Sequence, residues 1–218
     1  NREPLNREQL QTNKETIMRG NLKLSVPDWC FLKGGMDPVA YYARLKELGY
    51  DAVEMASPAN YAAIKKLGLT LLNVESPGFE KGINRMENHA ELIPGIIDAI
   101  RQAASNGVRQ VILFSGNREG QADEAGYQCC LSAIKQVLPA AEAEKIELVF
   151  EMLGAADHPG YHADNSRFGF RLARELKSAR FKLLYDIYHM HRMGEDVLAD
   201  VTGNMDVIGH IHIAGSPK

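Results

Sequence analysis

The sequence predicts an α/β protein whose parallel strands form a (β/α)8 barrel. Seven short apolar segments typical of buried strands alternate with helical segments, in units of about 30 residues. Such alternation with short connections indicates a parallel sheet, and this number of units favours a closed barrel over an open, doubly wound sheet. The open sheet would carry a glycine-rich turn after its first strand, and the sequence has none there.

Each element has its own local signal. Residues 1–20 are polar and charged, so we expect an N-terminal arm or surface helix ahead of a barrel domain that spans 21–218. The predicted strands are the apolar segments 21–26, 51–55, 69–74, 110–114, 147–151, 181–186 and 208–213. The predicted helical segments are 37–49, 57–68, 85–105, 122–144, 166–178 and 193–201. A capping residue followed by proline begins the first two helices, at Asp37 and Ser57, and a glycine ends each of them.

The composition describes one soluble globular domain. With 218 residues, 45% hydrophobic and 24% charged, and a formal net charge of −3, the chain can bury a substantial core and has no basic excess for nucleic acid. No apolar run approaches the ~18 residues that a membrane span needs. No apolar segment near the N-terminus marks a signal peptide, which we expect to be absent or already removed. Three cysteines without C-x-x-C spacing favour a reducing, cytoplasmic location.

Three predicted strands end on side chains that ligate metals. Glu151 ends the fifth strand, Asp186 ends the sixth, and His212 lies at the end of the seventh. Singly, each is more typical of a helix cap or a satisfied polar group. Together, at the carboxyl ends of consecutive strands, they would converge on the face where such barrels carry their active sites. A mixed set of this type suits Mn²⁺, Mg²⁺, Co²⁺ or Zn²⁺, so we expect these three residues to hold one divalent metal ion.

Four further residues are candidates for substrate contacts. His189 follows Asp186 by three residues, in the turn that leaves the strand, and Glu75 ends the third strand. Trp29 follows the first strand and would form part of a pocket wall, with ordinary core packing as the alternative. Asn117 lies in a glycine-containing loop that matches no phosphate-binding pattern and is expected on the substrate side.

Other polar residues are expected to have structural roles. His158 and His162 lie in the loop 154–165, which is long enough to form a lid, and as isolated loop histidines they are expected to be solvated. Glu147 and Lys182 come four residues before the two acidic strand ends. Because they face inward on neighbouring strands, we expect them to pair in the lower layer of the barrel.

The segments around Asp186 and His212 are the most specific in the chain. Asp186-Ile187-Tyr188-His189-Met190-His191-Arg192-Met193 and Ile208-Gly209-His210-Ile211-His212-Ile213-Ala214 closely resemble the hydroxypyruvate isomerase family, and the resemblance covers most of the chain from Asn21 onward. That family belongs to the xylose-isomerase-like TIM barrels, together with ketose 3-epimerases and endonuclease IV. The resemblance implies a divalent metal held by Glu, Asp, and His or Gln, matched here by Glu151, Asp186 and His212. It also implies a substrate-contacting histidine, matched by His189.

Two departures from the family pattern accompany this resemblance. Hydroxypyruvate isomerases often carry glutamine where this chain has His212, as the ketose epimerases do. The chain stops at Lys218, after the seventh strand, whereas the family's eighth strand carries a fourth ligand, a glutamate that is also the second acid/base, and an arginine usually follows. A barrel closes only when its eighth strand pairs with the seventh and the first. We therefore expect the eighth βα unit to be missing from a longer chain, which leaves the metal site open on one side.

The activity that the resemblance implies is a metal-dependent isomerisation of the aldose–ketose type. Glu151 would be the catalytic acid/base as well as a ligand, and would move a proton between adjacent carbons through an enediol, converting hydroxypyruvate to tartronate semialdehyde. The alternatives are a ketose 3-epimerase or other sugar isomerase, and a non-catalytic metal- or sugar-binding barrel. The expected partner is a small hydroxy-keto acid or sugar, with no nucleic acid and no membrane, while homo-oligomerisation stays open.

Overall fold

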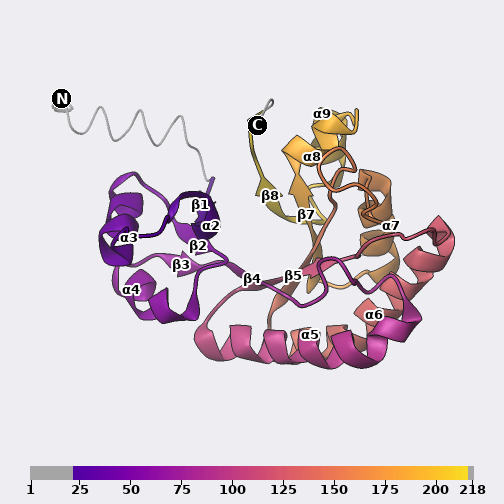
Figure 1. Cartoon of the computed structure of the whole chain (residues 1–218), viewed down its shortest axis with the longest axis horizontal. Helices are drawn as coiled ribbons and strands as arrows, with labels where there is room; N and C mark the ends of the chain where they lie inside the picture. Colours follow the sequence, from indigo (N-terminus) through magenta and orange to yellow (C-terminus); the bar gives the residue numbers. More distant parts are fainter. Residues whose placement is uncertain (1–21, 216–218) are drawn as a thin grey trace, which may run out of the picture.

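The strands and helices follow the predicted alternation. A computed structural model describes residues 22–215, and the N-terminal arm expected at 1–20 lies outside the described residues. The strands are β1 (Ser25–Pro27), β2 (Ala52–Glu54), β3 (Thr70–Leu71), β4 (Asn73–Glu75), β5 (Gln110–Phe114), β6 (Glu147–Glu151), β7 (Phe181–Asp186) and β8 (Ile208–His212). The helices are α2 (Asp28–Phe31), α3 (Pro38–Glu47), the 3₁₀ turn η1 (Pro58–Asn60), α4 (Tyr61–Lys66), α5 (Met86–Asn106), α6 (Asp123–Glu144), α7 (Ser166–Leu176), α8 (Ile187–Arg192) and α9 (Val197–Asn204). Figure 1 shows α3 to α7 following one another around the outside of the strands, which is the layering of a (β/α) barrel.

All strand pairs are parallel, and the strands form two sheets. The chain passes from one sheet to the other at Leu72, between β3 and β4. β1, β2 and β3 form a three-stranded sheet, and β4 to β8 form a five-stranded sheet in chain order. The predicted strand 69–74 is divided between the two sheets. Leu72, at the division, donates its N–H to the carbonyl of Val53 and accepts from the N–H of Gln110, each at 2.9 Å. Within residues 22–215, β8 pairs only with β7 and β1 only with β2, so the strands form a partial barrel.

The central strands are buried on both faces. Every residue of β5 is buried, because one face packs into the barrel interior and the other against the surrounding helices. α5 contributes Leu92, Ile96, Ile100 and Ala103 to this core, at the spacing that places them on one helix face. None of the described helices has both the length and the apolar character needed to cross a membrane. The apolar packing fixes the strands, and with them the polar residues at their carboxyl ends.

Helix boundaries follow the local signals in part, because Ser57 precedes the 3₁₀ turn η1 without a side-chain capping bond. Asp37 accepts hydrogen bonds from two main-chain N–H groups at the start of α3, as predicted. The helix predicted for 193–201 corresponds to α9, which begins later, at Val197, and the short helix α8 that precedes it was not predicted. Asp186 caps α8 directly after the strand, Gly194 leaves that helix with a left-handed φ of 79°, and Asp196 caps α9.

The lower layer of the barrel is paired differently from the prediction. Glu147 Oε1 accepts from Gln110 Nε2 at 2.7 Å, and Lys182 donates to the main-chain oxygen of Asp206 at 2.6 Å. The predicted pair of Glu147 with Lys182 is therefore wrong. Both side chains pack against Gly209, where a Cβ would lie 2.7 Å from Glu147 Oε1 and from Lys182 Cβ. The two side chains pass over this glycine to different partners.

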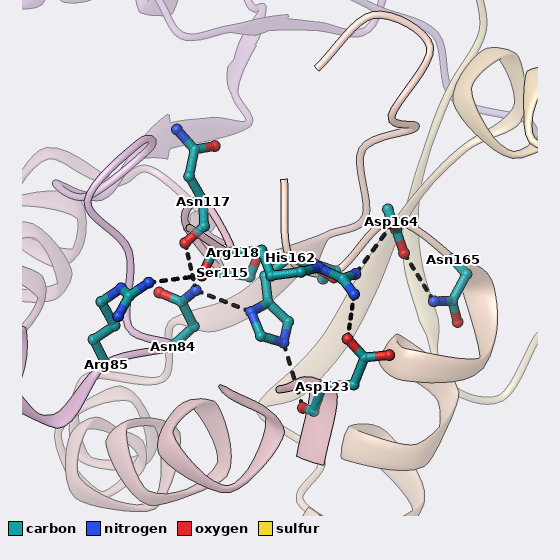
Figure 2. A network of polar contacts seen from close by, with 10 residues as sticks. Asn84, Arg85, Ser115, Asn117, Arg118, Asp123, His162, Asp164 and Asn165 are labelled. Atoms are coloured by element: carbon teal, nitrogen blue, oxygen red, sulfur yellow. Dashed lines mark hydrogen bonds and ion pairs between the residues drawn. The ribbon is translucent and has the colours of Figure 1, made fainter. Parts of the chain in front are cut away.

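A polar network fastens the loops that follow β4, β5 and β6 to one another (Figure 2). His162 lies at its centre and is buried, so the expectation that it is solvated is wrong. Its Nδ1 accepts from Asn84 Nδ2 at 3.1 Å, and its Nε2 donates to the carbonyl of Asp123 at 3.3 Å. Arg118 donates to the carbonyl of His162 at 3.1 Å. Gly126 of α6 makes room for the ring, because a Cβ there would lie 2.0 Å from His162 Cε1.

The burial of His162 predicts a pH-dependent contribution to stability. Burial lowers the pKa of His162 from its ordinary value of 6.5. The unfolded chain therefore takes up this proton first, so the contribution is complete above the unfolded pKa and is lost as the pH falls from about 6.5 toward the folded pKa. We expect the difference in unfolding free energy between the wild type and His162→Gln, measured by urea denaturation from about pH 8 to about pH 5, to shrink with falling pH. A difference that stays constant over this range would contradict the prediction.

Candidate metal centre

Glu151, Asp186 and His212, the three predicted ligands, lie together at the carboxyl ends of β6, β7 and β8. His212 Nδ1 is 3.4 Å from Glu151 Oε1 and 3.9 Å from Asp186 Oδ2. One potential ligand atom from each residue lies within 4.8 Å of the others. Atoms bound at ~2.0–2.2 Å to one ion lie about this close to each other. The three residues therefore fit a divalent metal ion both by chemical type and by spacing.

Strand register explains the convergence. Asp186 is paired with His212 between β7 and β8, and Glu151 is paired with Leu184 of β7. Side chains two residues apart on a strand share a face, so Leu184 and Asp186 point the same way. The three ligands therefore project from neighbouring strands into the barrel interior at one level.

Asp186 serves two neighbours at once. Its Oδ1 accepts from the N–H of His189 at 3.0 Å and so caps α8, while its Oδ2 faces His212. His189 thus lies in the first turn of α8, rather than in the turn expected from the sequence. This hydrogen bond fixes the orientation of the Asp186 carboxylate, whose other oxygen belongs to the ligand cluster.

Glu54, at the end of β2, is a fourth acidic residue of the site that the sequence analysis did not single out. Its side chain is 2% exposed and faces β8 across the barrel interior. It accepts hydrogen bonds from Ser25 Oγ at 2.6 Å, Asn73 Nδ2 at 2.7 Å, His210 Nε2 at 3.0 Å and His212 Nε2 at 2.9 Å. The signal was present in the sequence, because Glu54 is an acidic residue next to the end of the predicted strand 51–55.

The pKa values of Glu54 and His212 shift in opposite directions. Burial alone would raise the pKa of Glu54, but the hydrogen bonds and charges of His210 and His212 outweigh it and hold the pKa below its usual range. Burial alone would lower the pKa of His212, but hydrogen bonds to Glu151 and Glu54 raise it to about 10. The surrounding carboxylates therefore stabilise positive charge at the centre of the cluster, as a cation site requires.

A cavity of about 1720 Å³ opens beside the cluster. The three ligands line it, and so do three of the four candidates for substrate contacts, Trp29, Glu75 and His189. Trp29 lies in α2 and is 65% exposed, which rules out core packing. His158 also lines the cavity and is half-buried, with its ring edge-to-face against that of His189 at 5.1 Å between centroids.

Asn117 lies apart from these residues. Its main-chain oxygen accepts from Asn84 Nδ2 at 2.8 Å within the loop network (Figure 2), and its backbone forms an isolated bridge with Tyr161. It is not among the described residues that line the cavity. The structure therefore places Trp29, Glu75 and His189 in the lining of the cavity and leaves Asn117 in the supporting network.

The pKa shifts of His189 and Glu75 both favour the neutral form of the side chain. Burial lowers the pKa of His189 against the opposing charge of Asp186, which favours the neutral ring. His189 Nδ1 and Asp157 Oδ2, 3.8 Å apart, both lack a hydrogen-bond partner among the described residues. Partial burial raises the pKa of Glu75, and the charge of Glu151 adds to the effect. Both groups are thus suited to hydrogen bonding with a polar molecule in the cavity.

The fold and the cluster together define a (β/α) barrel with a carboxylate–imidazole donor set, of the kind that divalent metals favour, at the carboxyl ends of its strands. Residues 42–218 match the family model described as xylose isomerase-like TIM barrel, and the chain belongs to this family. The fold class and the resemblance predicted from the sequence are thereby confirmed.

Two curated relatives are similar in sequence. Hydroxypyruvate isomerase of Escherichia coli (strain K12) is 29% identical over 128 residues, which are 58% of this chain and 50% of the relative. The 2-oxo-tetronate isomerase of Cupriavidus necator is 28% identical over 141 residues, which are 64% of this chain and 54% of the relative. The chain thus spans about half the length of the curated relatives it matches.

Solved structures share the architecture. An AP endonuclease, family 2, from Brucella melitensis has a TM-score of 0.77 at 17% identity, covering 89% of this chain and 80% of its own. L-ribulose 3-epimerase has a TM-score of 0.74 at 17% identity, covering 89% and 70%. The IolI protein with a binding zinc atom has a TM-score of 0.72 at 16% identity, covering 88% and 72%. At these identities the likeness shows the fold alone.

The capping role of Asp186 predicts a difference between two substitutions. Asparagine caps a helix about as well as aspartate, whereas alanine cannot accept the hydrogen bond from His189. In metal-free protein we expect Asp186→Ala to be less stable than Asp186→Asn by about 0.5–2 kcal/mol. Urea denaturation with a chelator present measures the two unfolding free energies under identical conditions. Equal stability of the two variants would show that the cap contributes nothing.

Proposed function

We propose that this protein is a metal-dependent isomerase that interconverts a small hydroxyketone and the corresponding 2-hydroxyaldehyde, with hydroxypyruvate as its substrate. The observation that carries the proposal is the cluster of Glu151, Asp186 and His212 beside a cavity lined by further polar groups. The relatives named hydroxypyruvate isomerase and 2-oxo-tetronate isomerase support this reaction class. The zinc atom in a solved structure of the same fold supports one divalent ion, Mn²⁺, Mg²⁺, Co²⁺ or Zn²⁺, as the cofactor.

The proposed reaction moves protons without any net change in composition. A proton leaves C3 of hydroxypyruvate and one is added to C2, while another proton passes from the C3 oxygen to the C2 oxygen. The intermediate is an enediol and the product is tartronate semialdehyde. The carbon acid is weak, and a divalent ion held by Glu151, Asp186 and His212 would supply stabilisation for the negative charge that develops on the substrate oxygens.

The side chains around the cavity supply the remaining parts of the proposed mechanism. Glu151 takes the proton from one carbon and returns it to the next, because its carboxylate lies where the ligand cluster meets the cavity. His189, favoured as the neutral ring, hydrogen-bonds a substrate oxygen. Glu75, with its raised pKa, contacts a substrate hydroxyl group. Trp29 and Phe79 supply apolar surface to the cavity lining, which would limit access of water to a bound substrate.

A ketose 3-epimerase is the second candidate. His212 stands where the resemblance assigns a histidine to the ketose epimerases, and L-ribulose 3-epimerase is among the structures of this fold. An epimerase would use the same enediol but return the proton to the opposite face of the same carbon. NMR analysis of the products formed from hydroxypyruvate and from ribulose separates the two activities. Metal and substrate binding without any turnover would instead indicate a binding protein.

Glu151→Gln tests the assignment of the base. The change removes a proton acceptor and one ligand charge but keeps the size of the side chain. We expect isomerisation of hydroxypyruvate in the presence of Mn²⁺ to fall by about 10²–10⁴-fold, while circular dichroism and the melting temperature show a folded protein. Turnover at the wild-type rate would assign the chemistry to another residue.

Glu147→Gln is the matched control for this experiment. Glu147 lies on the same strand and loses the same charge, but it is bound to Gln110 in the lower layer, about 13 Å from Glu151 at 3.3 Å per residue. We expect this variant to alter stability more than rate. The contrast between the two variants separates loss of the base from a general loss of negative charge in the barrel.

A further inference from the structure

The environment of Glu54 is built to hold one carboxylate in one orientation. Its oxygens are removed from water, and the donors that replace water come from three different strands: Ser25 of β1, Asn73 of β4, and the histidines of β8. A carboxylate has about four acceptor positions, and Glu54 receives four hydrogen bonds, three at Oε2 and one at Oε1. Because its side chain is only 2% exposed, Glu54 acts through the groups that it touches.

The two ring nitrogens of His212 face opposite sides of the site. Nε2 lies 2.9 Å from Glu54 Oε2, whereas Nδ1 lies 3.4 Å from Glu151 Oε1 and 3.9 Å from Asp186 Oδ2. An ionised carboxylate can only accept, so the hydrogen of this contact is on Nε2 of His212. In the neutral ring, the lone pair is then on Nδ1, directed at the two carboxylates with which His212 would share an ion.

We propose that Glu54 is a positioning residue, which holds the proton of His212 on Nε2 and so presents Nδ1 to the divalent metal. The inference rests on the metal site of the proposed function. A hydrogen bond from a ligating imidazole to a buried carboxylate fixes both the tautomer and the ring orientation, and raises the basicity of the ligating nitrogen. Glu54 thereby sets the affinity of the site for the metal without contacting the ion.

His210 strengthens this arrangement. Its Nε2 donates to the same Glu54 oxygen at 3.0 Å, and its ring stands edge-to-face with that of His212 at 4.9 Å between centroids. Ser25 holds the second oxygen at 2.6 Å. The carboxylate therefore cannot rotate away from His212 without breaking several hydrogen bonds at once.

A rival use of the same residues is a second metal site. Glu54, His210 and His212 also bring one potential ligand atom each within 4.8 Å of the others. Asn73 argues against an ion there, because its amide Nδ2 donates to Glu54 Oε2 at 2.7 Å and so occupies the oxygen that an ion would need. We therefore infer that hydrogen-bond donors, rather than a cation, surround the carboxylate of Glu54. The number of metal ions bound by each chain is one outcome of the test.

The first test needs no substitution. The Zn²⁺-loaded wild-type protein, labelled with ¹⁵N at histidine, is examined by long-range ¹H–¹⁵N correlation spectroscopy, with His212 assigned by comparison with His212→Gln. We expect Nδ1 of His212 to bind the metal and Nε2 to carry the proton. Coordination through Nε2, or two bound Zn²⁺ ions for each chain by mass spectrometry, would overturn the proposal.

The second test measures affinity for Mn²⁺ by calorimetry in Glu54→Gln, with Glu147→Gln as the control that loses the same charge elsewhere in the barrel. We expect Glu54→Gln to bind Mn²⁺ about 10–100-fold more weakly than the wild type, and the control to bind as the wild type does. Equal affinity in a folded Glu54→Gln protein would refute the role, and the ¹⁵N spectrum decides alone if that variant does not fold. Failure of the wild type to bind either ion would remove the metal site and this role together, whereas binding without isomerisation would remove only the proposed activity.

Discussion

The buried carboxylate of Glu54 is the interaction on which the geometry of the site depends. An ionised carboxylate that is removed from water is tolerated only where hydrogen-bond donors replace its hydration. Here the donors come from β1 and β4 on one side and from β8 on the other. β1 belongs to the three-stranded sheet, whereas β4 and β8 belong to the five-stranded sheet. The hydrogen bonds to Glu54 therefore require the two sheets to meet at this carboxylate. His212 is held at that point, next to the ends of β6 and β7.

The direction of the parallel strands accounts for the rest of the site. β6 carries Glu147 at its start and Glu151 at its end, on the same inward face, and the two acids meet different surroundings. Glu147 accepts a hydrogen bond from the amide of Gln110 in the polar lower layer. Glu151 lies beside the imidazole of His212 at the open end. One strand therefore supplies both a structural and a candidate catalytic carboxylate, and only the level within the barrel distinguishes them.

Local patterns in the sequence predicted the strands, the Asp37 cap of α3 and the convergence of Glu151, Asp186 and His212. They did not predict the contact between Glu54 and His212, because these residues are 158 positions apart and alternation does not say which strand lies opposite across a barrel. The burial of His162 was equally hidden, since a loop has no periodicity and the space for its ring depends on a missing Cβ on α6. The short helix α8 was not predicted, although a helix cap was considered for Asp186 and one oxygen of its carboxylate does cap α8.

The acidic residues around the cavity differ in the hydrogen-bond donors and charges near them. We infer different roles for these residues from that difference. Glu54 is surrounded by donors, which hold its pKa low and keep it ionised. Asp186 gives one oxygen to the N–H of His189 in α8 and the other to the ligand cluster. Glu75 receives no hydrogen bond from the described residues, and burial together with the charge of Glu151 raises its pKa. Environments that push the pKa values of neighbouring carboxyl groups apart allow one fold to run both acid and base chemistry. In this barrel, the separation follows from topology, because the donors of β1, β4 and β8 all face Glu54, whereas Glu75 at the end of β4 lies within reach of the charge of Glu151.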